Sequence, residues 1–250
     1  MADAETVTAA LKAVAESTDR LLHTVTELDP GSVGEPSALP GWSRGHVLAH
    51  LSRNADSLVN LLDGARTGRD IPQYASETDR EDGIRSGAAR PLTEQLVDLE
   101  ASGARFAEAA AKLSDADWSA PVRHRSGAVF PALHLLAKRR QEVEYHHVDL
   151  AAGYTPEHWP EDFAAAELVR LAGQFAVAQV PAVLLLAEDT GTRAQLGPLG
   201  AEPGLTAEGP LRALTAWVSG RSAGAGLRLG RGGELLPDAV RALPQLPPLG

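Results

Sequence analysis

The 250-residue chain contains no cysteine. Disulfide bonds, thiolate metal ligands and a cysteine nucleophile are therefore excluded, and any thiol chemistry would need a thiol from outside the protein. The absence of cysteine also agrees with a cytoplasmic location. Aromatic residues make up only 4% of the chain, so Ala, Leu and Val carry most of the 44% hydrophobic content. Small aliphatic residues at helical spacing favour helices packed on helices.

Basic residues are also few, since 23 Lys and Arg stand against 33 Asp and Glu and give a formal net charge of -10. A surface of this charge repels phosphate backbones, so we expect no nucleic-acid partner. No uninterrupted apolar run approaches the thickness of a bilayer, and the N-terminal sequence MADAETVTAALKAV lacks the basic region and apolar core of a signal peptide. We therefore expect no membrane partner either.

The pattern of helical and breaker residues predicts two domains, 1–155 and 156–250. The boundary is placed in YTPEHWP, residues 154–160, because two prolines there separate helical stretches. Ser43 and Thr93 are predicted as helix caps, and Pro131 is expected in a first helical turn. Four helices are predicted in the first domain, at 6–28, 43–64, 93–113 and 131–152. The polar segment 68–91 is predicted to be a solvated loop with a short helix near 78–86, or a lid over a substrate.

The second domain is predicted to mix helices and strands. The expected elements are a helix at 161–180, a β-hairpin within 181–197, a strand end and turn before a helix at 210–218, a last strand within 224–232, and a short helix before a proline-rich tail. The fold class is therefore α plus α/β, with a four-helix bundle followed by a smaller mixed α/β domain.

The segment KRRQEVEYHHVDLAAG, residues 138–153, gathers ionisable groups in an alanine-rich background. Glu142 and His146 are four residues apart, so they project from one face of a helix and can share a metal ion. A third ligand must come from elsewhere, and the candidates are His46 and His50, which are also four apart within an amphipathic pattern. Gly153 is expected to end the later helix.

Each of these groups alone has a simpler explanation, either a hydrogen-bonded core histidine or a solvated glutamate. Together they are better explained by a metal, because burying a carboxylate beside two imidazoles without compensating charge costs several kcal/mol. Such ligands without thiolate suit zinc, with iron, nickel or manganese as alternatives. Three protein ligands and an open position predict a catalytic site rather than a structural one.

Four segments together resemble the mycothiol-dependent maleylpyruvate isomerase family of actinobacteria: LPGWSRGHVLAHLSRNADSL, GIRSGAARP, EVEYHHVDLAAGYTPEHWP and TAWVSGR. The resemblance extends from about Thr6 to Arg228. It implies a DinB-like four-helix bundle over 1–155 and a sterol-carrier-like α/β domain over 156–250. It also implies that zinc, or another divalent metal, is held by His50, Glu142 and His146.

The same resemblance implies a reaction and further site residues. A mycothiol thiolate would add to a cis enoyl acid, allow rotation about the resulting single bond, and leave. Arg221, at the end of the WVSGR motif, would reach across the domain boundary and pair with a substrate carboxylate. Arg85 and Arg90 are the groups of the polar segment 68–91 that could meet an anionic ligand, and one or the other is predicted to bind the second carboxylate.

Two other functions stay open beside the isomerase. A mycothiol S-transferase acting on an electrophile begins from the same thiolate, and a non-catalytic binding or sensor protein could be built on the same bundle. For either enzyme the expected partners are a small-molecule thiol and a small anionic or electrophilic substrate. A monomer or a homodimer is expected.

Overall fold

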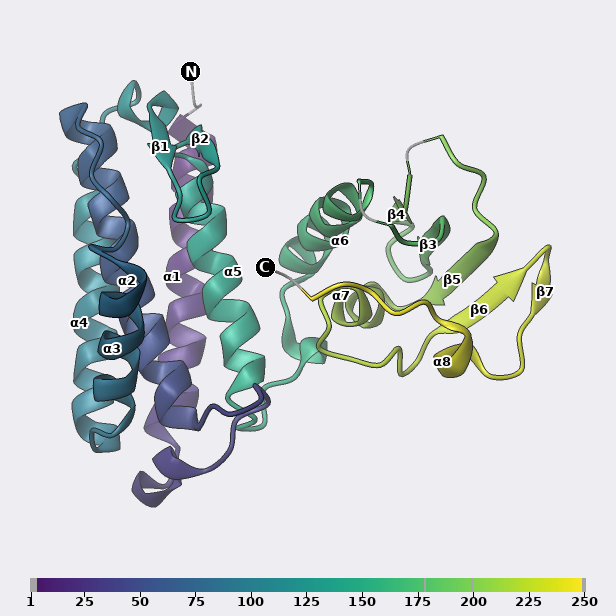
Figure 1. The fold of residues 1–250 in the computed structure, drawn as a ribbon, viewed down its shortest axis with the longest axis horizontal. Helices are drawn as coiled ribbons and strands as arrows, with labels where there is room; N and C mark the ends of the chain where they lie inside the picture. Colours follow the sequence, from purple (N-terminus) through teal and green to yellow (C-terminus); the bar gives the residue numbers. More distant parts are fainter. Residues whose placement is uncertain (1–3, 178, 199, 249–250) are drawn as a thin grey trace. The chain divides into compact units, whose positions relative to one another are not determined.

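The computed structural model of the chain describes residues 4–177, 179–198 and 200–248 (Figure 1). Contacts within the chain define two compact units, Met1–Tyr154 and Thr155–Gly250, which are described separately below. The first unit is mainly helical and the second combines a mixed sheet with helices, which confirms the predicted α plus α/β class. No helix in the described ranges combines the length and apolar character needed to cross a bilayer.

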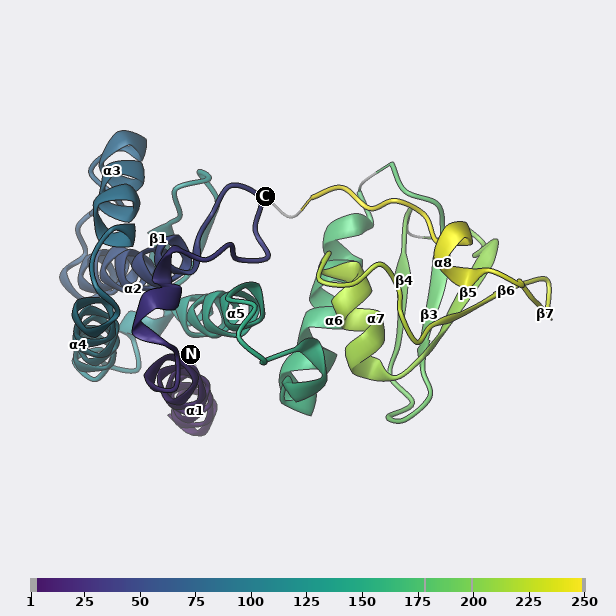
Figure 2. The ribbon, with the colours of Figure 1, turned by 90° about the horizontal axis from the view of Figure 1, so that it is seen from below.

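The first unit is a four-helix bundle formed by α1, α2, α4 and α5, with α3 packed on the outside of α2 (Figure 2). The bounds are α1 Ala4–Thr26, α2 Arg44–Thr67, α3 Glu77–Ala88, α4 Leu92–Ala110 and α5 His134–Asp149. Two 3₁₀ turns, η1 at Pro30–Gly34 and η2 at Asp117–Ser119, and a hairpin of β1 (Pro121–Arg123) with β2 (Val129–Pro131) complete it.

Helix α2 is the most buried helix of the bundle, and local signals set both of its ends. The predicted cap at Ser43 is confirmed, because its hydroxyl accepts the backbone N–H of His46. The helix runs past Gly64 and ends at Gly68, whose φ of 69° is left-handed and suits glycine. Between these ends Leu48 and Leu51 are fully buried, so the helix forms the centre of the apolar core.

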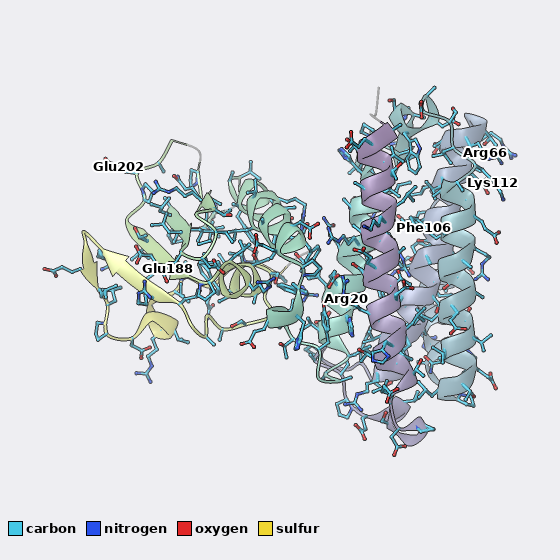
Figure 3. The ribbon with its side chains drawn as sticks, turned by 180° about the vertical axis from the view of Figure 1, so that it is seen from behind. Arg20, Arg66, Phe106, Lys112, Glu188 and Glu202 are labelled. Carbon is cyan, nitrogen blue, oxygen red and sulfur yellow. The ribbon has the colours of Figure 1, made fainter. Side chains whose placement is uncertain are left out.

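Phe106 is one of the side chains that pack between the inner faces of the helices in this bundle. It is 2% exposed and belongs to the same buried cluster as Val7, Val14 and Leu58. Figure 3 shows Phe106 between α1 and α4, whereas Arg66 projects outward at the end of the bundle. At this level of the bundle apolar side chains fill the interior, as the helical periodicity predicts.

The prediction that Thr93 caps a helix is wrong. Helix α4 begins at Leu92 with Pro91 in the cap position, and no side chain in the described part of the chain caps it. The Pro91 carbonyl instead accepts the backbone N–H groups of Glu94 and Gln95, each at 3.1 Å. Proline fixes its own φ and enters a helix easily from this position, so no capping hydroxyl is needed.

The prediction that Pro131 lies in a first helical turn is also wrong. Pro131 ends strand β2, opposite Pro121 of β1, and α5 begins only at His134. Proline has no N–H to donate, so a ladder end accommodates it as readily as a helix start. The helix also ends earlier than predicted, at Asp149, and the chain has already turned at Ala151, with φ 53°, before it reaches Gly153.

The polar segment 68–91 contains a longer helix than the predicted one. Helix α3 spans twelve residues, and the Ser76 hydroxyl caps it by accepting the Asp79 N–H at 3.0 Å. A Cβ added at Gly87 would lie 2.7 Å from the Ala49 Cβ, so glycine allows α3 to approach α2 closely. Part of the predicted loop is therefore a fixed wall of the bundle.

The second unit has a five-stranded sheet in the order β4-β3-β5-β6-β7, in which β3 and β5 are parallel and the other neighbours antiparallel. The predicted hairpin is confirmed as β3 with β4. The predicted last strand is β6, which β7 follows. Helix α6 ends before residue 180, and residue 178 lies outside the described residues. The bounds are η3 Pro156–His158, α6 Glu161–Phe175, β3 Val183–Ala187, β4 Arg193–Leu196, β5 Leu205–Gly209, α7 Leu211–Val218, β6 Arg228–Arg231, β7 Glu234–Leu235 and α8 Ala239–Ala242.

Helices α6 and α7 cover one face of this sheet (Figure 2). Their buried side chains, such as Leu168 and Leu214, form one cluster with Leu185 of β3 and Leu229 of β6. The apolar residues alternate along β3, where Val183, Leu185 and Ala187 are buried, as expected for a strand with one covered face.

Candidate metal centre

Three ionisable side chains meet where α2 faces α5. His50 Nε2 lies 2.9 Å from Glu142 Oε2, and His146 Nε2 lies 3.3 Å from the same oxygen. The two imidazole rings are 4.6 Å apart between centroids and nearly perpendicular. One potential ligand atom from each residue lies within 4.8 Å of the others. The i,i+4 pair of α5 and one histidine of α2 are thus brought together.

A buried arginine fixes the two helices at this point. Arg139 is 1% exposed and lies three residues before Glu142 on the same stripe of α5. Its Nη1 donates to the Leu51 carbonyl at 2.9 Å and to Asn54 Oδ1 at 3.0 Å, both on α2. Burial lowers the pKa of Arg139 to about 10, so it remains charged at neutral pH. The ligand-bearing faces of α2 and α5 are therefore held opposite each other.

The carboxylate of Glu142 is ionised in this setting. Burial opposes its ionisation, but hydrogen bonds from His146 and His50 outweigh burial and hold the pKa of Glu142 well below its usual range. Burial is also the main reason why the pKa of His50 is lowered. The exposed fractions are 8% for His50, 32% for Glu142 and 15% for His146, so Glu142 is the group most accessible from outside.

Asp149 holds the outer side of the His146 ring. His146 Nδ1 lies 2.9 Å from Asp149 Oδ2. Burial lowers the pKa of His146, but hydrogen bonds to Asp149 and Glu142 outweigh it, and the pKa is raised. A carboxylate on the second nitrogen is the usual means of orienting a metal-binding imidazole.

These residues fit a divalent metal. An ionised carboxylate and two imidazoles converge on one point, and His50 Nδ1 is buried without a hydrogen-bond partner among the described residues. A buried donor set of this kind is stabilised by a cation, because the cation replaces the protons that the three groups otherwise share. His50, Glu142 and His146 would supply one ligand atom each.

The two neighbouring histidines have other roles. His46 Nδ1 accepts the Ser43 N–H at 3.2 Å and lies 2.8 Å from the Ser43 hydroxyl, so it completes the capping box of α2. His147 stacks on the Tyr154 ring at 3.6 Å between centroids, and its Nε2 lies 2.8 Å from the Thr24 hydroxyl. Neither residue belongs to the cluster.

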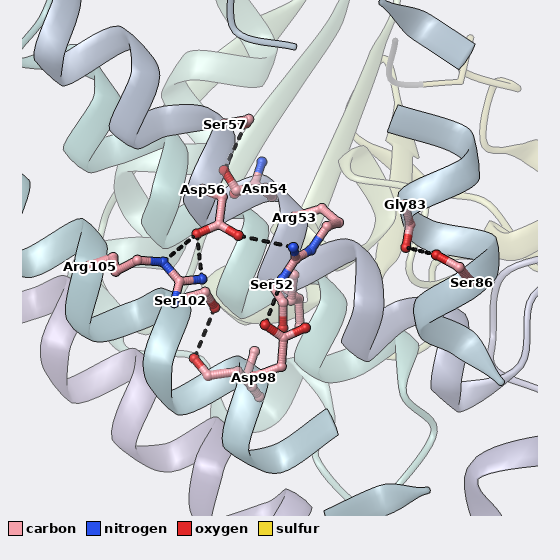
Figure 4. Close-up of polar contacts among 12 residues, drawn as sticks. Ser52, Arg53, Asn54, Asp56, Ser57, Gly83, Ser86, Asp98, Ser102 and Arg105 are labelled. Atoms are coloured by element: carbon pink, nitrogen blue, oxygen red, sulfur yellow. Dashed lines mark hydrogen bonds and ion pairs between the residues drawn. The ribbon is translucent and has the colours of Figure 1, made fainter. Parts of the chain in front are cut away.

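The predicted anion-binding arginines of the first unit pair with aspartates. Arg85 is 70% exposed and lies 2.6 Å from Asp82. Arg90 Nη2 lies 2.5 Å from Asp98, which also pairs with Arg53. Figure 4 shows further ion pairs between α2 and α4, in which Arg53 pairs with Asp98 and Asp56, and Asp56 pairs with Arg105. The predicted role of Arg85 and Arg90 in anion binding stays a prediction.

Arg221 belongs to the second unit, where its Nη1 donates to the Ser219 carbonyl at 2.9 Å. Arg221 and Arg212 both line a cavity of about 650 Å³ within that unit. The predicted reach of Arg221 toward the metal ligands stays a prediction.

Two residues near the cluster are missing from the predicted site. Tyr74 is a partly buried phenol whose pKa is raised by burial and by the charge of Glu142. The Arg80 guanidinium lies 6.0 Å from the centre of the Tyr74 ring and 3.2 Å from Glu77. The only signal in the sequence was that both fall in the polar segment predicted as a possible lid.

Comparisons with known proteins agree on one family. A family model for the mycothiol maleylpyruvate isomerase N-terminal domain matches residues 14–151. Two crystal structures, of a mycothiol-dependent maleylpyruvate isomerase and of its variant with one histidine replaced by alanine, are similar to this chain with TM-scores of 0.80 and 0.79. Each is 29% identical and covers 92% of this chain and 95% of its own. Among curated proteins, no sequence matches significantly.

A four-helix bundle with a His–Glu–His cluster between two of its helices defines the structural class. The chain belongs to the mycothiol maleylpyruvate isomerase family. Membership in this family supports an enzyme that works with a small-molecule thiol.

Proposed function

We propose that the chain is a zinc- and mycothiol-dependent cis–trans isomerase of the maleylpyruvate isomerase type. The observation that carries this proposal is the convergence of His50, Glu142 and His146 within 4.8 Å. The similarity to crystal structures named as mycothiol-dependent maleylpyruvate isomerase supports the same reaction class.

The donor set suits catalytic zinc, which is commonly held by three protein groups and keeps a position for a small molecule. The chain has no cysteine, so the nucleophilic sulfur has to come from a bound thiol. When bound, the metal and mycothiol together would supply a thiolate at neutral pH.

The residues of the chain would orient the metal ligands and the substrate and balance their charges. Glu142 provides the negative charge among the ligands, and Asp149 fixes the orientation of the His146 ring. We assign Arg221 to one carboxylate of the substrate and Arg85 or Arg90 to the other, because a guanidinium can bind a carboxylate through two parallel hydrogen bonds.

The test uses protein purified without a histidine tag, loaded with zinc, and incubated with mycothiol and maleylpyruvate while fumarylpyruvate is followed. We expect conversion that requires both metal and thiol and that is lost in His50→Ala. A conjugate formed on a model electrophile, without isomerisation, would instead establish the S-transferase. Protein that retains no metal and converts nothing would favour a non-catalytic binding or sensor protein.

A further inference from the structure

The connection between α2 and α3 is pinned against α2. Asn60 Nδ2 donates to the Gln73 carbonyl at 3.1 Å, and the 4% exposed side chain of Gln73 donates to the Ser57 hydroxyl at 3.1 Å. Ser57 lies seven residues after His50 and therefore on the same face of the helix. The next residue along the connection, Tyr74, is thus fixed beside the face that carries the metal ligand.

The phenol of Tyr74 interacts electrostatically with the charged groups of the site. Burial raises its pKa, the carboxylate of Glu142 acts in the same direction, and Ser57 and Arg80 act on it as hydrogen-bond partners. The net pKa is above the ordinary value, so the phenol keeps its proton at neutral pH. Tyr74 is therefore a neutral phenol that can donate a hydrogen bond, and the charge of Glu142 acts on it.

The Arg80 guanidinium lies near Tyr74, 6.0 Å from the centre of its ring. Its side chain is 16% exposed, and its charge is near enough to His50 to add to the effect of burial in lowering that pKa. It also lines a cavity of about 270 Å³ together with Trp42, whose ring lies 5.6 Å from the ring of His50 between centroids. Helix α3, which carries Arg80, is packed closely on α2 through Gly87.

Conjugate addition to an alkene creates charge that a donor in this position can stabilise. When a nucleophile adds to a carbon–carbon double bond conjugated with a ketone, a bond forms at the alkene carbon and the alkene pair moves to the ketone oxygen. After rotation the pair returns, the double bond reforms, and the nucleophile leaves with its bonding pair. No proton and no external electron are consumed.

We propose that Tyr74 and Arg80 bind the ketone oxygen of the substrate, with the Tyr74 hydroxyl as hydrogen-bond donor and the Arg80 guanidinium as the positive charge beside it. This inference rests on the proposed function and names the residues that would hold the ketone oxygen of its substrate. A donor aimed at an oxygen that gains charge is more valuable in the transition state than in the bound substrate.

The first test is Tyr74→Phe in the zinc-loaded full chain, which removes the hydroxyl and keeps the ring. We expect kcat for maleylpyruvate to fall about 100-fold, as for the loss of one oxyanion donor, while KM changes little. Zinc content is measured in parallel and should be unchanged. A wild-type kcat in Tyr74→Phe would overturn the role of the hydroxyl.

The second test measures binding without turnover. Succinylpyruvate, which lacks the alkene but keeps the ketone and both carboxylates, is titrated into metal-loaded protein by calorimetry. Arg80→Gln should bind it about 10-fold more weakly, in line with the loss of one charged hydrogen bond, and Arg80→Lys should recover part of the loss. Arg66→Gln, which changes an arginine paired with Asp63 on the surface, is the matched control and should bind as the wild type does.

Equal affinity in Arg80→Gln and the wild type would overturn the role of Arg80. If the wild-type protein retains zinc but fails to isomerise maleylpyruvate, the proposed function fails, and the calorimetric arm still decides whether Arg80 binds the oxygen-rich ligand.

Discussion

His146 and Asp149 form a carboxylate–imidazole contact of 2.9 Å on the side of the ring that faces away from Glu142. The Asp149 side chain is 3% exposed, so water competes little for this contact. Asp149→Asn keeps the shape and removes the charge. We expect its zinc affinity to be about 10- to 100-fold weaker, measured by competition with a chromophoric chelator.

The control for this change is Asp63→Asn, which alters a half-exposed aspartate of α2 that pairs with Arg66 three residues further along the same helix. Its affinity should equal that of the wild type. Wild-type affinity in Asp149→Asn would show that the contact does not orient the ligand.

Removing a ligand should remove the metal and leave the bundle. His50→Ala and Glu142→Ala each take one of three converging groups, and two groups rarely retain a divalent ion. Elemental analysis should give about one zinc per chain for the wild type and almost none for either variant, with the helical circular dichroism retained. His46→Gln should keep its zinc, since His46 is engaged in the cap of Ser43. Full zinc occupancy in His50→Ala or Glu142→Ala would refute the assignment.

The sequence predicts the ligand-bearing helices because their signals are local. Spacing of four places Glu142 and His146 on one face, and the Ser43 cap fixes the phase of α2. Spacing alone cannot choose between His46 and His50, since both lie on the same face. The choice depends on which residue the cap engages, and the structure shows that the cap uses the His46 ring.

The remaining features depend on contacts between distant segments. The β1–β2 hairpin is only three residues long on each side and contains prolines, so its sequence carries no clear strand signal. Tyr74 and Arg80 lie in a polar stretch without periodicity, and their position is set by Gln73 bonds to α2 and by the close approach at Gly87. Neither the Gln73 hydrogen bonds nor the close approach at Gly87 can be recognised from the sequence without knowledge of the fold.

A second buried carboxylate, outside the metal cluster, ties α1 to α5. Glu144 is 1% exposed and accepts hydrogen bonds from Ser17 at 2.6 Å, Arg20 at 2.7 Å and Tyr154 at 2.6 Å. Glu144→Gln keeps the volume but removes the charge, which leaves these donors poorly satisfied. We expect the free energy of unfolding to fall by about 2 kcal/mol, less than for a fully buried pair because Arg20 is 37% exposed.

Urea denaturation measures this change. Tyr154→Phe removes one of the three hydrogen bonds and should cost about 1 kcal/mol, and neither variant should lose zinc. A Glu144→Gln protein as stable as the wild type would mean that the cluster does not contribute to the stability of the bundle.

His124, in the turn between β1 and β2, should stay neutral well into the acid range. Burial lowers its pKa from 6.5 to about 4, and the charges of Lys138 and Arg125 act in the same direction. Its Nδ1 accepts the Ser126 backbone N–H at 3.2 Å, which protonation there would break. Because the folded pKa lies below the unfolded one, the unfolded chain binds more protons between these values. The stability contribution is therefore complete above about pH 6.5 and is lost as the pH falls toward 4.

Imidazole NMR resonances report this directly. We expect the His124 signals of the folded protein to titrate with a midpoint near 4 and His124→Gln to show a shallower loss of stability between pH 6.5 and 4. A midpoint near 6.5 would mean that the turn opens to water, because only a solvated ring separated from Lys138 and Arg125 would regain the ordinary value.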